Sequence, residues 1–147
     1  MTHKKLLTKR LAISILNITH DTVVVDVDSW VVQDDITVVG LEMDSQCLIS
    51  RGLLVEAGGF NITAEVTRAA ELNKDSALLV SKITGAWSIA GDAPVTTHSE
   101  QIIFPLDVRV DIDNGEALNL IMSASSLMTS LDTLNIATTA NILYYNR

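Results

Sequence analysis

The chain has 147 residues, which suits one domain with a sizeable core, and it is acidic, with a formal net charge of −8. An acidic surface argues against nucleic acid as a partner, because affinity for phosphates depends on clustered Lys and Arg. Hydrophobic residues make up 48% of the chain and charged residues 19%, yet no apolar run approaches the roughly 18 residues that a membrane-spanning helix needs. The aliphatic surplus therefore favours burial between subunits, because obligate homo-oligomer interfaces resemble a domain core.

The beginning of the chain is basic. We interpret residues 1–10 as a basic N-terminal arm and residues 11–147 as a single domain; the arm carries Lys4, Lys5, Lys9 and Arg10. The arm would touch an acidic neighbouring subunit or nucleic acid, or it would be a solvated leader. Residues 11–18 lack a small-residue cleavage site and alternate with period two, so they predict a strand of the mature protein and not a secretion signal.

Alternating apolar residues predict a series of short strands along the chain. Val23, Val25 and Val27 place a strand of mixed exposure at residues 22–28. β-Branched residues dominate the next strand, in which Gly40 suggests a bulge or a close backbone approach. The strands expected after residue 35 are 36–49, one flanked by loops within 51–59, 60–66, 77–89, 99–105, 108–113, 118–122 and 134–145. Residues 67–75 are the best helical candidate, but they are too few for more than a helical turn.

The prediction of a sandwich depends most on the residues on either side of Asn114-Gly115. Val108, Val110 and Ile112 alternate with charged residues, and Asn114-Gly115 then favours a tight turn, because both residues tolerate positive φ. The alternation resumes after the turn, which predicts a hairpin with one apolar face. Such a hairpin needs a second sheet over it. The sequence therefore predicts an all-β, two-sheet antiparallel β-sandwich of about eight strands with little helix.

The sequence offers no catalytic motif. The histidines are His3, His20 and His98, and no serine sits in a G-x-S-x-G elbow, so we assign no catalytic residue and no cofactor. Cys47 is the only cysteine, which excludes an intrachain disulfide and a cysteine-based zinc site. We expect Cys47 to be a small buried hydrophobe.

Paired carboxylates are the only candidates for a metal site. Residues 111–116 resemble the start of a calcium-binding loop, but the glycine falls one residue early, and Met122 stands where a bidentate glutamate is required. We therefore assign no metal, and Asp111 and Asp113 are the candidates if a cation binds. Asp26 and Asp28 would either share a cation or form a solvated polar face of their strand.

The few aromatic residues are candidates for contacts between subunits. Trp30 and Trp87 would anchor the core or an interface, or would stack on a sugar ring. Tyr144 and Tyr145 alternate on the last strand, so one of them should face inward and the other outward. Together with the basic arm, the interface candidates are Lys4, Lys5, Lys9, Arg10, Trp30, Trp87, Tyr144 and Tyr145.

The order of these features resembles the small β-sandwich proteins of virus and phage particles. The resemblance is carried by D-S-W-x-V and D-I-T-V-x-G segments, a F-P-x-D-x-x-V strand, a G-E-x-L-x-L turn and strand, and closing paired tyrosines, at residues 28–32, 35–40, 104–110, 115–120 and 140–145. It implies a jelly-roll-like fold and a virion location, in a decoration, minor capsid or spike-base subunit. It also implies that the subunit is a homotrimer bound to the major capsid or another virion protein.

Three functions remain open at this point. The first is a non-enzymatic structural subunit that associates through β-sheet faces. The second is a carbohydrate- or receptor-binding adhesion module that uses loops at one end of the sandwich. The third, an enzyme on a cupin-like jelly roll, ranks last because the strands carry no cluster of histidines.

Overall fold

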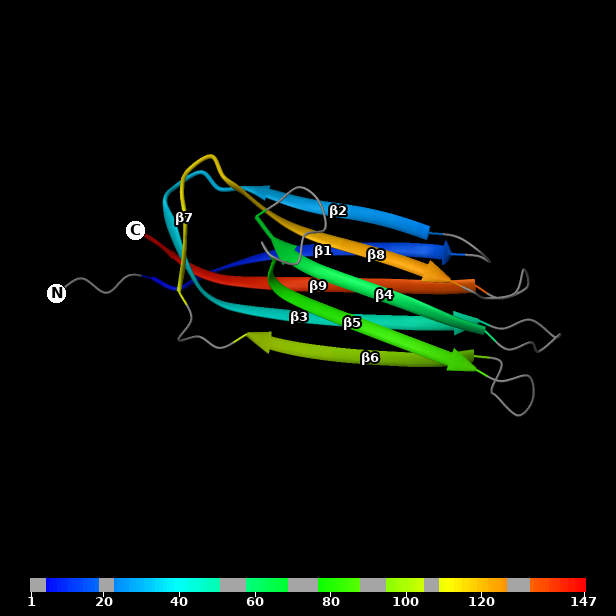
Figure 1. Cartoon of the computed structure of the whole chain (residues 1–147). Helices are drawn as coiled ribbons and strands as arrows, with labels where there is room; N and C mark the ends of the chain where they lie inside the picture. Colours follow the sequence, from blue (N-terminus) through cyan, green and yellow to red (C-terminus); the bar gives the residue numbers. More distant parts are fainter. Residues whose placement is uncertain are drawn as a thin grey trace.

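The computed structural model describes residues 5–18, 23–50, 58–68, 77–87, 95–104, 109–126 and 133–147 (Figure 1). Within these ranges the chain forms nine β-strands and no helix, which confirms the all-β prediction. No helix of the described chain is therefore long and apolar enough to cross a membrane. The strands are β1 Leu7–Ile18, β2 Val23–Val31, β3 Ile36–Ser50, β4 Gly58–Thr67, β5 Ala77–Trp87, β6 Val95–Phe104, β7 Val110–Ile112, β8 Ala117–Ser126 and β9 Thr133–Asn146.

The strands form two antiparallel sheets that pack face to face (Figure 1). One sheet has the order β1-β9-β3-β6, with the short β7 also paired to β3, and the other has the order β2-β8-β4-β5. β6 and β7 lie along the same side of β3, because β6 ends opposite Leu41 and β7 begins opposite Val38. β7 therefore continues the edge that β6 forms, and it is the strand expected at residues 108–113, shortened to three residues.

The pairing is nested around the connection between β4 and β5. β4 pairs with β5, β3 with β6, β2 with β8 and β1 with β9, so the chain folds back on itself as one long double-stranded ribbon. The ribbon then rolls up, which places β3 beside β9 and β4 beside β8. This order of strands is the jelly roll, the fold that the sequence resemblance implies.

The ladder between β3 and β9 joins the two halves of the chain. It runs from Ile36 opposite Asn146 to Ser50 opposite Thr133, with a shift in register between Val38 and Gly40. The predicted bulge at Gly40 is confirmed.

The core lies between the two sheets and consists mainly of aliphatic side chains. β8 contributes Leu118, Leu120, Met122 and Ala124, which alternate along the strand as predicted and are all fully buried. Other large buried side chains come from β1, β3, β4 and β9, among them Leu11, Leu41, Met43, Ile62, Leu134 and Ile142. Cys47 is 1% exposed, and burial raises the pKa of its thiol to about 11, so it is the neutral, buried residue that the sequence predicts.

Two hydroxyl groups are buried in this apolar core. Ser45 and Thr138 lie opposite each other on β3 and β9, and their oxygens are 3.0 Å apart in a hydrogen bond. The Thr138 hydroxyl also lies 3.1 Å from the Met122 sulfur on the opposite sheet. This hydrogen bond gives each buried hydroxyl a partner, so neither is left unpaired in the apolar core.

The predicted turn at Asn114-Gly115 is present, but the predicted hairpin is wrong. Glu116 donates its backbone N–H to the Asp113 carbonyl at 3.0 Å, and Gly115 has a φ of +93°. The strands on either side pair with different partners, since β7 belongs to the sheet of β3 and β8 to the sheet of β2. Period-two alternation shows that two strands flank a turn, but it does not show which sheet each strand joins.

The expected arm overlaps the first strand. β1 begins at Leu7, so residues 7–10 pair with β9, with Leu7 opposite Tyr144 and Arg10 opposite Asn141. Residues 1–4 lie outside the described residues, as does most of the helical turn expected at residues 67–75. The division into an arm and a single domain stays a prediction.

The cost of replacing Gly115 should come from its backbone conformation alone, because a Cβ added there meets no atom within 4 Å. We expect Gly115→Ala to lower the free energy of unfolding by about 1 kcal/mol, since a left-handed conformation costs a residue with a Cβ that much. Gly115→Asn should cost less, because asparagine tolerates positive φ. Urea unfolding of the three proteins measures the difference, and equal stability of all three would contradict the assigned turn.

The buried hydroxyl pair should show energetic coupling. Thr138→Val leaves the Ser45 hydroxyl without its partner, so we expect a loss of about 1–3 kcal/mol in the free energy of unfolding. The double variant Ser45→Ala, Thr138→Val should be more stable than the sum of the single changes predicts, because no unpaired hydroxyl remains. Strictly additive effects in denaturant unfolding would show that the two hydroxyls do not depend on each other.

Candidate functional site

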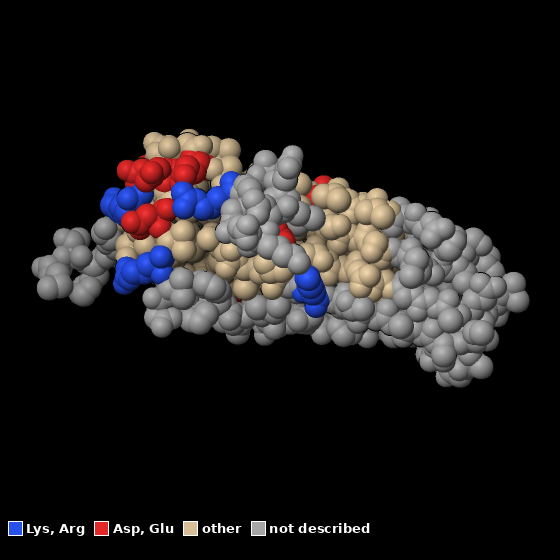
Figure 2. All heavy atoms as spheres, in the orientation of Figure 1, with Lys and Arg blue, Asp and Glu red and all other residues tan. Residues whose placement is uncertain are grey.

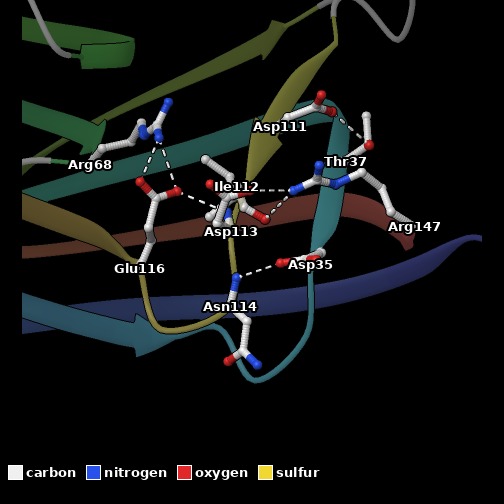
Figure 3. A network of polar contacts seen from close by, with 9 residues as sticks. All are labelled: Asp35, Thr37, Arg68, Asp111, Ile112, Asp113, Asn114, Glu116 and Arg147. Atoms are coloured by element: carbon white, nitrogen blue, oxygen red, sulfur yellow. Dashed lines mark hydrogen bonds and ion pairs between the residues drawn. The ribbon is translucent and has the colours of Figure 1, made fainter.

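A network of polar contacts occupies the end of the sandwich where β7 and the C-terminus lie (Figure 3). The two metal candidates belong to it but bind different partners. Asp111 accepts a hydrogen bond of 2.8 Å from the Thr37 hydroxyl, and Asp113 forms an ion pair of 2.6 Å with Arg147. Each carboxylate therefore joins β7 or its turn to a neighbouring part of the same sheet.

Arg147 forms several of the contacts at this end of the sandwich. Its guanidinium also donates to the Ile112 carbonyl at 3.2 Å, and its backbone N–H donates to the Asp35 carbonyl at 2.9 Å. The hydrogen bond that its guanidinium donates to the Asp113 carboxylate raises the pKa of Arg147. The Asp35 carboxylate accepts the Asn114 N–H at 2.9 Å, so the end of β9 and the turn after β7 are held to the same residue.

Glu116 fixes the turn from its other side. Its carboxylate accepts the backbone N–H of Asp113 at 2.8 Å and two bonds from Arg68, at 2.6 and 2.9 Å. The hydrogen bond from the Asp113 N–H contributes most to lowering the pKa of the Glu116 carboxyl, and the hydrogen bond from Arg68 contributes next. Figure 2 shows acidic and basic side chains gathered together at this end of the molecule.

The arrangement at this end is a structural clasp. Across the described parts of the chain, no three His, Cys, Asp or Glu side chains lie close enough together to hold a metal ion. The carboxylates of Asp111 and Asp113 are instead used in hydrogen bonds that hold β7, the turn and the C-terminus in place. A role for them in binding a cation stays a prediction.

The structure brings three of the interface candidates together. The rings of Trp30 and Tyr144 have their centroids 5.0 Å apart at an angle of 51°, and the Lys9 ammonium lies 5.9 Å from the centroid of Trp30. Trp30 and Tyr144 also pack against the core. These residues come from β2, β9 and β1, so they join the two sheets within one molecule.

The remaining candidates lie apart from this cluster. Tyr145 contacts Arg109, whose guanidinium lies 5.7 Å from the ring centroid and donates to the hydroxyl. Lys5 and Arg10 are exposed, whereas Lys4 lies outside the described residues. Trp87 ends β5 and His98 lies in β6, but neither side chain is among those described. An interface role for all these residues stays a prediction.

The most unusual surface lies on β2, and the sequence did not single it out as a site. Four valines alternate along this edge strand and point to solvent: Val23 is 72% exposed, Val25 57%, Val27 43% and Val31 50%. We call them the β2 valine row. In an ordinary half-buried strand the apolar residues face the core and the polar residues face water.

The orientation of β2 is fixed at its C-terminal end. Val24 and Trp30 pack against the core, and Val32, one residue beyond the strand, is 1% exposed. Val32 also exchanges two backbone hydrogen bonds of 2.9 Å with Gly115 and Glu116. Because side chains alternate with period two, burying the even-numbered residues exposes the odd-numbered valines.

Both carboxylates of β2 accept backbone N–H groups, although Asp26 is exposed and only Asp28 is partly buried. Asp28 accepts the N–H of Ala12 on β1 at 2.9 Å, and Asp26 accepts the N–H of Val27 at the same distance. Asp26 is exposed and Asp28 partly buried, so whether the two form a solvated polar face or share a cation stays a prediction. The need to bury Trp30 and Val32 decides the orientation of the whole strand.

A second apolar feature lies on the outer face of the other sheet. A shallow depression of about 280 Å³ lies between β1, β9 and β3, with Leu16 and Leu48 at its sides and the small Ala137 between them. Leu16 is 67% exposed and Leu48 38%. The other side chains around the opening, Ser14, Gln46 and Asn135, carry no charge.

One buried carboxylate has no evident role. Glu65 on β4 is 1% exposed and lies opposite Ile121 of β8 and Val80 of β5. No hydrogen-bond donor among the described residues reaches its Oε2. The alternation of residues 60–66 predicts a polar position here, but it gives no sign that the position is buried.

The Glu116 contacts should make stability depend on pH. A carboxyl whose pKa is lowered by folding stabilises the protein fully above its ordinary value of 4.5 and loses this contribution as the pH falls through the folded-state pKa. We therefore expect Glu116→Gln to lower the thermal midpoint at pH 7 and to reduce the further loss of stability below pH 4.5. Asp34→Asn, at an exposed carboxylate, is the control, and identical pH profiles for Glu116→Gln and the wild type would contradict the assigned contacts.

Comparison with known proteins gives matches in structure only. No family model and no curated protein matches the sequence. A chain of Desmodium yellow mottle tymovirus has a TM-score of 0.39 and 6% identity, and the match covers 97% of this chain and 89% of that one. A chain in a structure of infectious bursal disease virus, Gx strain, has a TM-score of 0.38 and 8% identity, over 99% of this chain and 38% of that one. Both chains are similar to this one in structure, at TM-scores below 0.4.

Proposed function

We propose that this protein is a non-enzymatic structural subunit of a virus or phage particle, of the decoration, minor capsid or spike-base type. In this role it associates with copies of itself, as a homotrimer, and binds a neighbouring shell protein. The observation that carries the proposal is the β2 valine row, four exposed aliphatic side chains on one side of an edge strand, interrupted only by Ser29. Apolar patches rimmed by polar residues on a folded protein mark sites of association.

The jelly roll narrows the choice of function without deciding it. Viral capsid domains, lectins and cupins share this fold, so the surface must discriminate among them. A structural subunit needs apolar area for its neighbours, which the β2 valine row and the depression at Ala137 supply. A lectin would present aromatic rings to a sugar, but Trp30 and Tyr144 here pack on each other and against the core.

The charge distribution supports contact with a second shell protein. The chain has a net charge of −8, yet Lys5 and Arg10 at the beginning of β1 are exposed. Exposed basic side chains next to the chain terminus would bind an acidic surface on a neighbouring subunit.

The oligomeric state tests the proposal. We expect light scattering after size-exclusion chromatography to give the mass of a trimer at micromolar concentration, because the aliphatic surface is then buried between copies. Raising the salt concentration should leave this assembly intact, since apolar contacts are not screened. A monomer at every concentration, together with binding on a glycan array, would contradict the proposal in favour of an adhesion module.

A further inference from the structure

We propose that Asn114 is a site of spontaneous deamidation, and that the hydrogen bonds around its turn control when the reaction occurs. Asn114-Gly115 forms the turn between β7 and β8, and Asn114 is exposed. Its carboxamide points away from the other side chains labelled in Figure 3, so water reaches it. The reaction is independent of the proposed function, because it involves the chemistry of the turn alone.

The reaction needs only Asn114, Gly115 and water. The backbone nitrogen of Gly115 loses its proton to a base in the solvent and attacks the Cγ atom of the Asn114 carboxamide. The new N–C bond closes a succinimide ring, and the amide nitrogen takes up a proton from water and leaves as ammonia. Water then opens the ring at either carbonyl, which gives aspartate or isoaspartate at position 114. Asparagine is thermolabile, and a following glycine favours ring closure because it has no Cβ beside the attacking nitrogen.

The folded turn holds the attacking nitrogen away from this reaction. The Gly115 N–H donates a hydrogen bond of 2.9 Å to the Val32 carbonyl. The preceding N–H, of Asn114, donates to the Asp35 carboxylate at 2.9 Å. Ring closure requires the peptide group between Asn114 and Gly115 to rotate until its nitrogen faces Cγ. This rotation breaks the bond to Val32, so the reaction must wait for a local opening of the turn.

The contacts of the clasp determine how often the turn opens. Asp35 binds on both sides, because its carboxylate accepts the Asn114 N–H and its carbonyl accepts the Arg147 N–H. On the far side of the turn, the Glu116 N–H donates to the Asp113 carbonyl at 3.0 Å, and the Asp113 N–H donates to the Glu116 carboxylate at 2.8 Å. Hydrogen bonds to ionised groups are stronger than neutral ones. We therefore expect the bond to the Asp35 carboxylate to contribute most to keeping Asn114 unreacted.

The products of the reaction would keep the turn open. In isoaspartate the main chain runs through the former side chain, so an additional methylene group separates the Cα atom of residue 114 from the next nitrogen. The Gly115 N–H is thereby displaced from the position in which it binds Val32. Both products also place a negative charge at a residue whose N–H is bound by the Asp35 carboxylate, and the like charges repel each other. Deamidation thus converts a reversible opening into a permanent one.

The rate of deamidation at position 114 tests the proposal. Peptide mass mapping measures this rate in the folded wild type and in the same chain unfolded by guanidinium chloride. We expect the folded protein to react about tenfold or more slowly, because the turn is closed most of the time. Asp35→Ala, at an exposed position, removes the acceptor of the Asn114 N–H and should raise the rate in the folded protein about tenfold.

Two control variants separate opening of the turn from other effects. Asp34→Ala removes the neighbouring exposed carboxylate and should react like the wild type. Thr138→Val weakens the buried hydroxyl pair in the core, so it should leave the rate unchanged if the turn opens locally. A rate raised as much in Thr138→Val as in Asp35→Ala would show that only global unfolding admits the reaction. That result would overturn the inference, as would equal rates in Asp35→Ala and the wild type, or an Asn114 that stays intact in the unfolded chain.

Hydrogen exchange tests the effect of the modification. Protein with isoaspartate at position 114, separated by ion exchange, should exchange the N–H groups of Gly115 and Arg147 about tenfold or more faster than unmodified protein. Asn114→Asp adds the charge without the additional methylene group and should show a smaller increase. Unchanged exchange at both N–H groups in the isoaspartate protein would contradict a permanent opening of the clasp.

Discussion

The ladder between β3 and β9 is the constraint on which the rest of the molecule depends. It joins residues about 100 positions apart, from Ile36 opposite Asn146 to Ser50 opposite Thr133, and it has β1 on one side and β6 with β7 on the other. Without it the nested ribbon could not roll up, and neither sheet would have a partner to cover its apolar face. The clasp formed by Arg147, Asp113 and Asp35 lies at the end of this ladder, where β9 leaves the sheet. The most polar part of the structure therefore secures the terminus of its central strand.

The same packing explains the exposed valines. β2 cannot bury both sets of its alternating residues. Val24, Trp30 and Val32 are the ones that pack in or against the core, and Val32 also bonds to the backbone of the turn at Gly115. Trp30 is the largest side chain of the strand, and it packs on Tyr144 under Lys9. The valines therefore point to solvent, and the carboxylates of Asp26 and Asp28 accept backbone N–H groups. The exposed valines and the packing of Trp30 against the core thus arise from one register.

Several aromatic and charged residues that look like contact residues in the sequence have partners within the molecule. Trp30, Tyr144 and Lys9 join the sheets, Tyr145 contacts Arg109, and Asp111 and Asp113 hold β7 and the C-terminus. The residues that make up the candidate contact surfaces are instead plain aliphatic ones, such as Val25 and Leu16. Aromatic residues draw attention because they make up only 4% of this chain, but their rarity does not show whether they face a neighbour or the core.

The sequence by itself determined the strands, the turn at Asn114-Gly115, the bulge at Gly40 and the alternation that buries Leu118, Leu120 and Met122, because these features follow from local period and backbone preference. It also indicated a sandwich, since strands with one apolar face must cover each other. Only the tertiary structure decided that β7 and β8 join different sheets, that β2 turns its valines outward and that Glu65 is buried. These outcomes depend on which distant strand lies alongside and on which of two competing apolar sets packs better. Local alternation describes both faces of a strand, and only the partner across the core determines which face is buried.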